Sequence, residues 1–184
     1  MMLYLASGSP RRSKLLKDAG IRFKVLKALY HEAPHRHLSP SALVKKHALG
    51  KALAAAKKLK DGAILAADTV VYFDRKIIGK PSSLAGAASI LRSLQGRVHT
   101  VYTGVAFLEI RRGRVTRKRS FYEKTVVHLK KMSEKDIRRY FRRVDPLDKA
   151  GAYAIQARGA GIVRKVEGSF SNAVGLPMER LKFL

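Results

Sequence analysis

The chain has 184 residues, enough for one sizeable hydrophobic core but not for several independent domains, so we expect a single domain over residues 1–184. It contains no cysteine, which excludes disulfides, thiolate zinc sites and cysteine nucleophiles. Its 39 basic and 13 acidic side chains give a net charge of +26, and this excess predicts anionic partners such as phosphates, nucleic acid or an acidic membrane surface.

The first third of the chain alternates short apolar runs with helical patterns. Residues 3–6 read as a buried strand, and the turn that follows places Ser9 and Pro10 at the N-cap and first position of a helix. That helix is expected to run from Arg11 to about Asp18 and to end at Gly20. A strand over 23–29, a polar connection over 30–38 and a helix over 39–59 come next.

The remainder is dominated by strands. Residues 63–67 predict a buried strand with Asp68 directly at its end, continuing through 70–73 into a hairpin turn at 74–76. Further on we expect a helix over 83–94, two long strands over 98–110 and 114–130, a helix from Ser133 to about Arg143, and a terminal helix after Pro177. This order favours a mixed α/β or α+β domain around one curved sheet.

The turn from Ser7 to Arg12 is a candidate anion site. Free backbone N–H groups at a helix start attract anions, whereas arginine in a first turn opposes the helix dipole unless an anion lies there. Ser7, Ser9, Arg11 and Arg12 supply hydroxyl and guanidinium groups in this turn. An ordinary capped helix with solvated arginines is the alternative interpretation.

Only a few acidic residues occupy positions suited to catalysis or metal binding. Asp68 follows a buried strand, where a carboxylate could hold a divalent cation or orient a water, although an aspartate there is more often a turn residue. Glu32 lies beside His31, His35 and His37, but a loop containing proline does not fix these histidines on one face, so we interpret them as ordinary loop residues. Lys51, Lys80 and Gln156 are unremarkable individually.

Taken together, these segments resemble the Maf family, in order and over almost the whole chain. The segments that carry the resemblance are LASGSPRR (5–12), Lys51 in its Ala-rich helix, AADTVV (66–71), GKP (79–81), Gly96-Arg97 with VYTGV (101–105), DKAGAYAIQ (148–156) and NAVGLP (172–177). The resemblance implies an elongated mixed sheet flanked by helices, with two lobes around a cleft, as in ITPase-like folds.

The resemblance also implies hydrolysis of a nucleoside triphosphate to the monophosphate and pyrophosphate, with Mg²⁺ or Mn²⁺ as cofactor. Asp68 would accept a proton or organise the metal, and Glu32 would be a second acidic metal ligand. The residues that would cradle the phosphates are Ser7, Ser9, Arg12, Lys51 and Lys80. Arg11, Thr69 and Gln156 would set specificity, in the form that resembles the dTTP/UTP branch rather than the 7-methyl-GTP branch.

The chain departs from the family pattern in two places, and other interpretations stay open. His31 stands where the family has an acidic residue, and little chain remains after Pro177. The alternatives are a pyrophosphatase of the same fold for 7-methyl-GTP or a broad range of nucleotides, and a basic nucleic-acid-binding protein, suggested by residues 111–119 and 138–143. No apolar run reaches the roughly 20 residues of a membrane span, so we expect a soluble, cytoplasmic protein without membrane partners, and a homodimer is a reasonable assembly.

Overall fold

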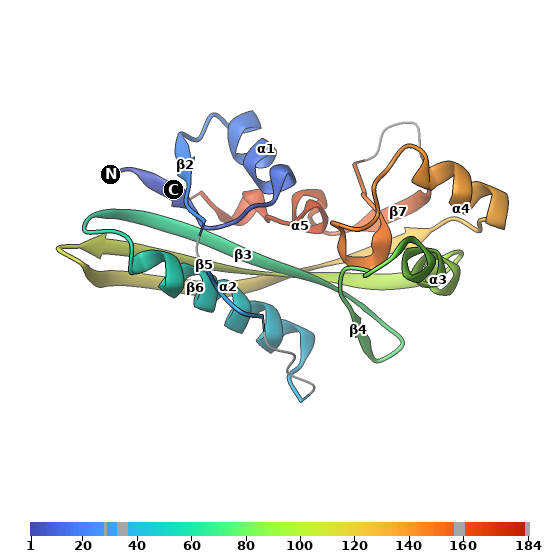
Figure 1. Ribbon diagram of the computed structural model, residues 1–184, viewed down its shortest axis with the longest axis horizontal. Helices are drawn as coiled ribbons and strands as arrows, with labels where there is room; N and C mark the ends of the chain where they lie inside the picture. The colour runs from blue at the N-terminus through green and yellow to red at the C-terminus, as the bar shows by residue number, and fades with distance from the viewer. Residues whose placement is uncertain (28, 33–36, 157–160, 183–184) are drawn as a thin grey trace.

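The computed structural model describes residues 1–27, 29–32, 37–156 and 161–182, and it confirms the mixed α/β class. A long, seven-stranded mixed sheet carries helices on both faces (Figure 1). None of the helices in the described ranges is both long enough and apolar enough to span a membrane. The elements in chain order are β1 (Leu3–Leu5), α1 (Pro10–Asp18), β2 (Phe23–Val25), α2 (Pro40–Ala56), β3 (Gly62–Phe73), β4 (Lys76–Ile78), α3 (Leu84–Leu94), β5 (Val98–Arg111), β6 (Arg114–Leu129), α4 (Glu134–Phe141), η1 (Ala150–Ala152), β7 (Val163–Glu167), α5 (Phe170–Val174) and η2 (Met178–Arg180).

Three long antiparallel strands form the centre of the sheet. The strand order is β2-β1-β3-β5-β6-β7, and β4 pairs with β3 as a hairpin. β1 is parallel to both β2 and β3, whereas the β3–β5, β5–β6 and β6–β7 pairs are antiparallel. Left-handed φ angles at Asp74 and Arg75, and at Arg112 and Gly113, make the two tight hairpin turns that the sequence predicts.

Helix α2 lies almost in backbone contact with one face of the sheet. Its N-cap Ser39 accepts a hydrogen bond from the Ala42 N–H, as the sequence predicts for a Ser-Pro start. Small side chains on the helix, including Ala48 and Ala52, are fully buried against the equally small Ala66 and Ala106 of the sheet. Small residues on both sides let the two backbones approach closely.

The opposite face of the sheet is covered by two groups of elements (Figure 1). Near the chain termini, Leu16 of α1 and Leu176 pack with Leu65 and Phe107 of the sheet. Towards the other end, Leu91 of α3 and Ile137 of α4 pack with sheet residues of a separate apolar cluster. Because both faces are covered, β3 is buried along most of its length.

Two expectations from the sequence are wrong in this part of the chain. The strand predicted over 23–29 ends at Val25, and position 28 lies outside the described residues. The helix predicted after Pro177 is only the 3-10 turn Met178–Arg180. The helical turn comes earlier, as α5, because Ser169 caps it by accepting from the Asn172 N–H and Gly175, with φ of 126°, ends it.

The outer edge of β6 is exposed and basic. β7 pairs only with Val126–Leu129, so within the described ranges the part of β6 over 114–121 runs past its neighbour. Four cationic side chains lie on this exposed stretch: Arg114, Arg117, Lys118 and Arg119. Glu109 of β5 forms an ion pair with Arg117, at 3.0 Å.

Gly104 tests the close approach of α2 to β5. A Cβ at this position would lie 2.3 Å from both the carbonyl carbon and oxygen of Val44, which are backbone atoms that cannot rotate away. We expect Gly104→Ala to lower the free energy of unfolding by about 1–3 kcal/mol, measured by urea denaturation. Gly79→Ala is the matched control, since a Cβ there has no atom within 4 Å, and equal losses in the two variants would contradict the close approach.

Candidate active site

The site is a cleft beside the middle of β3, not at a strand end as the sequence predicts for Asp68. On this side of β3, β1 pairs with Ala63–Leu65 and β4 with Val71–Phe73, while β5 follows the other side throughout. Among the described strands, none pairs with residues 66–70 on the β1 side. A gap in the sheet therefore flanks Asp68, a residue that is only 6% exposed.

The pleat of β3 directs neighbouring residues to opposite faces, and the gap lets both faces open into one cleft. Asp68 points towards α2, where it meets Lys51, and Thr69 points towards α1, where it meets Arg12. The cleft has a volume of about 990 Å³. All of the residues singled out in the sequence line it: Ser7, Ser9, Arg11, Arg12, Glu32, Lys51, Asp68, Thr69, Lys80 and Gln156.

Lys51 joins two of the acidic side chains that line the cleft, Asp68 and Glu32. Its Nζ lies 2.7 Å from Asp68 Oδ1 and 2.6 Å from Glu32 Oε1. Burial by itself would raise the pKa of Glu32, but the hydrogen bond and charge of Lys51, with the charges of His47 and Lys80, outweigh it and lower that pKa. Lys51 therefore contacts both carboxylates and favours the charged form of Glu32.

Arg12 is a buried cation held on three sides by protein oxygens. Nε donates to the Gly175 carbonyl at 2.8 Å, one terminal nitrogen donates to Ser7 Oγ at 3.0 Å, and the other donates to Thr69 Oγ1 at 2.9 Å. Burial lowers the pKa of Arg12 to about 10, although the negative charge of Asp68 opposes this shift. The guanidinium stays charged at neutral pH and has a fixed orientation.

The start of α1 offers backbone donors to the cleft. Ser9 is the N-cap, as predicted, yet its side chain makes no capping hydrogen bond, and the first turn contains no acidic residue. Instead the Ser9 N–H donates to Ser7 Oγ at 3.2 Å. A helix start with a partial positive charge, no acidic side chain and two arginines is suited to an anion.

Arg11 ties the start of α1 to the facing wall of the cleft. One of its terminal nitrogens lies 2.6 Å from Asp148 Oδ2, and the other donates to the Asp148 carbonyl at 3.0 Å. Asp148 also contacts the Lys149 ammonium, and these two cations outweigh burial and lower the Asp148 pKa. Asp148 lies in the segment 148–156 but is not among the residues predicted for the site, although an acid directly before the Lys149-Ala150-Gly151 turn was a usable signal.

The carboxylate oxygens of the cleft are suited to bind a hard divalent cation that is also coordinated by an anionic ligand such as a phosphate. Within the described ranges, which exclude His35, no group of three or more acidic or histidine side chains gathers as a ready metal site. The Asp68 and Glu32 carboxylates lie close together because both contact the Lys51 ammonium. Mg²⁺ commonly uses one or two carboxylates and takes its other ligands from phosphates and water.

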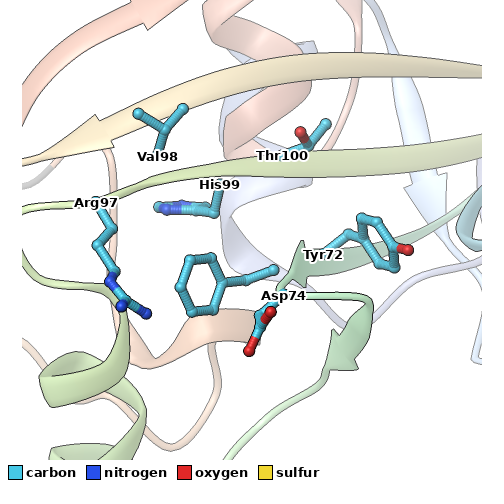
Figure 2. A pocket seen from close by; sticks show the side chains of 7 residues that line it. Tyr72, Asp74, Arg97, Val98, His99 and Thr100 are labelled. Carbon is cyan, nitrogen blue, oxygen red and sulfur yellow. The ribbon is translucent and has the colours of Figure 1, made fainter.

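A buried histidine supports the far wall of the cleft from behind. Tyr153 lines the cleft, and its hydroxyl lies 2.6 Å from His99 Nε2. Figure 2 shows His99 between Arg97 and Thr100 in a separate open hollow beside Tyr72 and Asp74. His99 is 3% exposed, and burial, with a smaller effect of His128, lowers its pKa to about 4.

The low pKa of His99 predicts acid sensitivity of folding. Above its ordinary pKa near 6.5 His99 is neutral in both states, but as the pH falls from 6.5 to about 4 only the unfolded chain gains the proton. We expect the free energy of unfolding to fall by roughly 2–3 kcal/mol over this range through His99. Urea denaturation of the native protein and His99→Gln from pH 7.5 to 4.5 checks this, and parallel curves would contradict it.

The sequence matches a known protein family over almost its whole length. Residues 2–184 match the family described as Maf-like protein. The dTTP/UTP pyrophosphatase of Pelotomaculum thermopropionicum is 43% identical over 179 residues, covering 97% of this chain and 92% of that protein. The dTTP/UTP pyrophosphatase of Gloeobacter violaceus is 46% identical with the same coverage. The fold is similar to that of the Staphylococcus aureus Ham1 protein, with a TM-score of 0.50 and 14% identity over 88% of this chain and 91% of that one.

Proposed function

The chain belongs to the Maf-like protein family, and on this premise we propose that it hydrolyses dTTP and UTP to the nucleoside monophosphate and pyrophosphate. The observation that carries the proposal at the level of residues is the bridge from Lys51 to Asp68 and Glu32 inside a cation-lined cleft. Cleavage of a phosphoanhydride bond by water is promoted by a carboxylate that orients and deprotonates the water and by cations that bind the phosphates.

We assign the phosphate contacts to the start of α1 and to the cations around it. Ser7, Ser9 and Arg12 lie at the helix start, and Lys51 and Lys80 line the cleft. Attack of water on the α-phosphorus increases the negative charge on the departing pyrophosphate and the phosphoryl oxygens, so fixed cations lower the barrier. Asp68 orients the attacking water and accepts its proton.

Asp68 and Glu32 are the residues that would hold a divalent cation, as carboxylate ligands beside Lys51. Such a cation, Mg²⁺ or Mn²⁺, would neutralise phosphate charge and polarise the phosphoryl oxygens. Around it, Lys51 contacts both carboxylates and lowers the pKa of Glu32.

The nucleobase is assigned to the wall that carries Gln156. The amide of Gln156 has both a donor and acceptors for the edge of a thymine or uracil ring. Arg11 binds Asp148 at the start of this wall, and Thr69 binds Arg12 on the opposite side. A cytoplasmic location, a homodimer and weak nucleic-acid binding driven by the net charge of +26 remain predictions from the sequence.

Replacing Asp68 tests the reaction and the proposed base together. We expect Asp68→Asn to lower kcat for dTTP by about 10²–10³, because the amide cannot take the proton of water. Ion-exchange chromatography of products from dTTP, UTP, CTP, ATP, GTP and 7-methyl-GTP is the measurement. Glu134→Gln, which removes an exposed carboxylate on α4, is the control and should cleave as the native protein does. Diphosphate and orthophosphate as products would contradict the proposal.

Metal removal tests the role of the carboxylate pair. We expect chelation by EDTA to abolish turnover and added Mg²⁺ or Mn²⁺ to restore it. Glu32→Gln should raise the Mg²⁺ concentration for half-maximal rate by about tenfold, the loss of one charged ligand contact of about 1.4 kcal/mol. Turnover that is insensitive to EDTA would remove the metal from the proposal, and an unchanged Mg²⁺ requirement in Glu32→Gln would remove Glu32 as a ligand.

A further inference from the structure

A line of side chains leads from Arg12 in the cleft into the fully buried part of the sheet. The Arg12 guanidinium donates to Thr69 Oγ1 at 2.9 Å, and Thr69 Oγ1 lies 2.9 Å from Thr103 Oγ1 on the neighbouring strand. Thr103 Oγ1 donates in turn to the Asn172 carbonyl at 3.0 Å. Thr103 and Asn172 are both completely buried, so water does not compete for these contacts.

The direction of each hydrogen bond in this line follows from proton counting. A carbonyl oxygen only accepts, so Thr103 gives its single hydroxyl proton to Asn172. Thr69 must then supply the proton between the two threonines, because otherwise the Thr103 oxygen would face a buried carbonyl at 3.0 Å without a hydrogen. A guanidinium only donates, so Thr69 accepts from Arg12. Every link therefore points the same way, away from the cleft.

We propose that Thr69, Thr103 and the Asn172 carbonyl form a relay that positions Arg12 for the phosphates, so that Thr69 influences the substrate through Arg12 and not by donating to the base. The Thr69 hydroxyl has a single proton, and in the relay it donates this proton to Thr103 Oγ1, so none is left for a hydrogen bond to the base. The inference rests on the proposed function, since it assigns a task within the phosphate site. Thr69, Thr103 and Asn172 are positioning residues, and Arg12 makes the contact.

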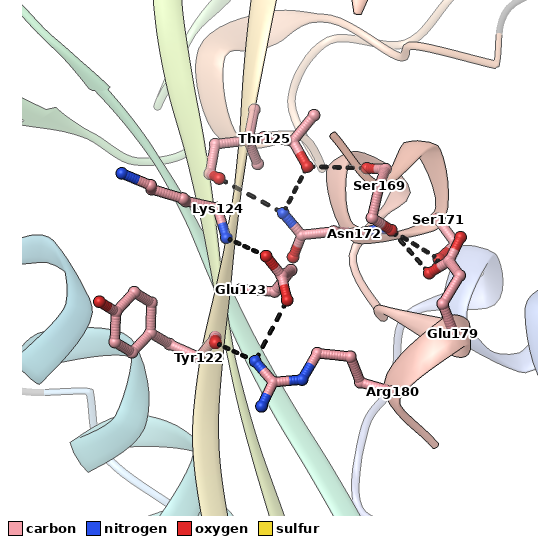
Figure 3. A network of polar contacts seen from close by, with 10 residues as sticks. Tyr122, Glu123, Lys124, Thr125, Ser169, Ser171, Asn172, Glu179 and Arg180 are labelled. Carbon is pink, nitrogen blue, oxygen red and sulfur yellow. Dashed lines mark hydrogen bonds and ion pairs between the residues drawn. The ribbon is translucent and has the colours of Figure 1, made fainter. Parts of the chain in front are cut away.

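The inner end of the relay is fixed to the sheet. Figure 3 shows the Asn172 side chain against Thr125 of β6, where its Nδ2 donates to Thr125 Oγ1 at 2.9 Å. Thr125 Oγ1 donates onward to the Ser169 carbonyl at 2.7 Å, at the cap of α5. The Gly175 N–H donates to the Asn172 carbonyl at 2.9 Å, and the Gly175 carbonyl accepts from Arg12 Nε. The same turn thus holds Arg12 directly and through the relay.

Arg12 keeps donors for a ligand after these contacts. A guanidinium has five N–H donors. The three hydrogen bonds to Gly175, Ser7 and Thr69 leave one N–H on each terminal nitrogen of Arg12, a residue that lines the cleft. Since the group is already ordered, binding an anion costs little further side-chain entropy. A relay that loses one hydroxyl should weaken anion binding while the charge of Arg12 is retained.

Removing the Thr103 hydroxyl tests the relay. Thr103→Val keeps the shape of the side chain, and Thr103→Ser keeps the hydroxyl. We expect Thr103→Val to raise KM for both dTTP and UTP by about tenfold with kcat nearly unchanged, as for loss of uniform binding. Its Kd for inorganic tripolyphosphate, measured by calorimetry without turnover, should rise by a similar factor. Thr103→Ser should restore both values to within about threefold.

Ile110→Val is the matched control for a merely structural effect. Ile110 lies on the same strand as Thr103, about 20 Å along it, is only 1% exposed and packs in the apolar cluster against α2. It should lower the melting temperature about as much as Thr103→Val while KM and the tripolyphosphate Kd stay native. If Thr103→Val does not fold, Thr103→Ala takes its place with the same expected values.

Three results would overturn the relay. They are native tripolyphosphate binding in Thr103→Val, an equal loss of binding in Ile110→Val, or an effect on dTTP that UTP does not share. The last would mean that Thr69 reads the base. The proposed function is judged separately on the native protein: if it cleaves no nucleotide but its tripolyphosphate affinity depends on Thr103 as expected, the relay stands and the reaction does not.

Discussion

The site depends on a gap beside the middle of β3, where no strand of the described ranges pairs with residues 66–70 on the β1 side. β1 leaves the sheet after Leu5 and β4 joins it only at Val71, so the backbone between them borders a cleft instead of a neighbour. A continuous sheet would separate Asp68 and Thr69 on opposite faces, whereas the gap lets both line one cavity. β5, paired along the other side, keeps this unsupported part of β3 extended and rigid.

Burial and charge act together around this gap. Lys51 stands between two carboxylates, and Arg12 is surrounded by neutral oxygens with Asp68 nearby. Leaving a buried charge without compensation costs far more than an exposed one, so the ionised groups are arranged as a connected set. The geometry that solves this problem of desolvation also produces a cavity lined by fixed cations and carboxylates.

Local features of the fold were predictable from the sequence, and features that depend on distant contacts were not. Ser39 and Ser133 cap their helices where the residue pattern predicts, because capping needs only neighbouring residues. The position of Asp68 within a strand was missed, since the apolar run gives no sign of which strands pair beside it. Arg12 was predicted as an anion-binding residue from the helix-start pattern and from the resemblance, but its acceptors Thr69 and Gly175 lie far along the chain. Thr103 looks like any strand threonine in the sequence.

The exposed edge of β6 has a consequence for association between copies of the chain. A free strand edge is a template for further strands, yet the cations over 114–121 would bring like charges together if two such edges met. This protection is electrostatic, with a reach of about 10 Å at 0.1 M salt and only about 3 Å at 1 M. A basic edge therefore keeps the sheet from growing under dilute conditions, and polyanions or concentrated salt would remove the barrier to self-assembly.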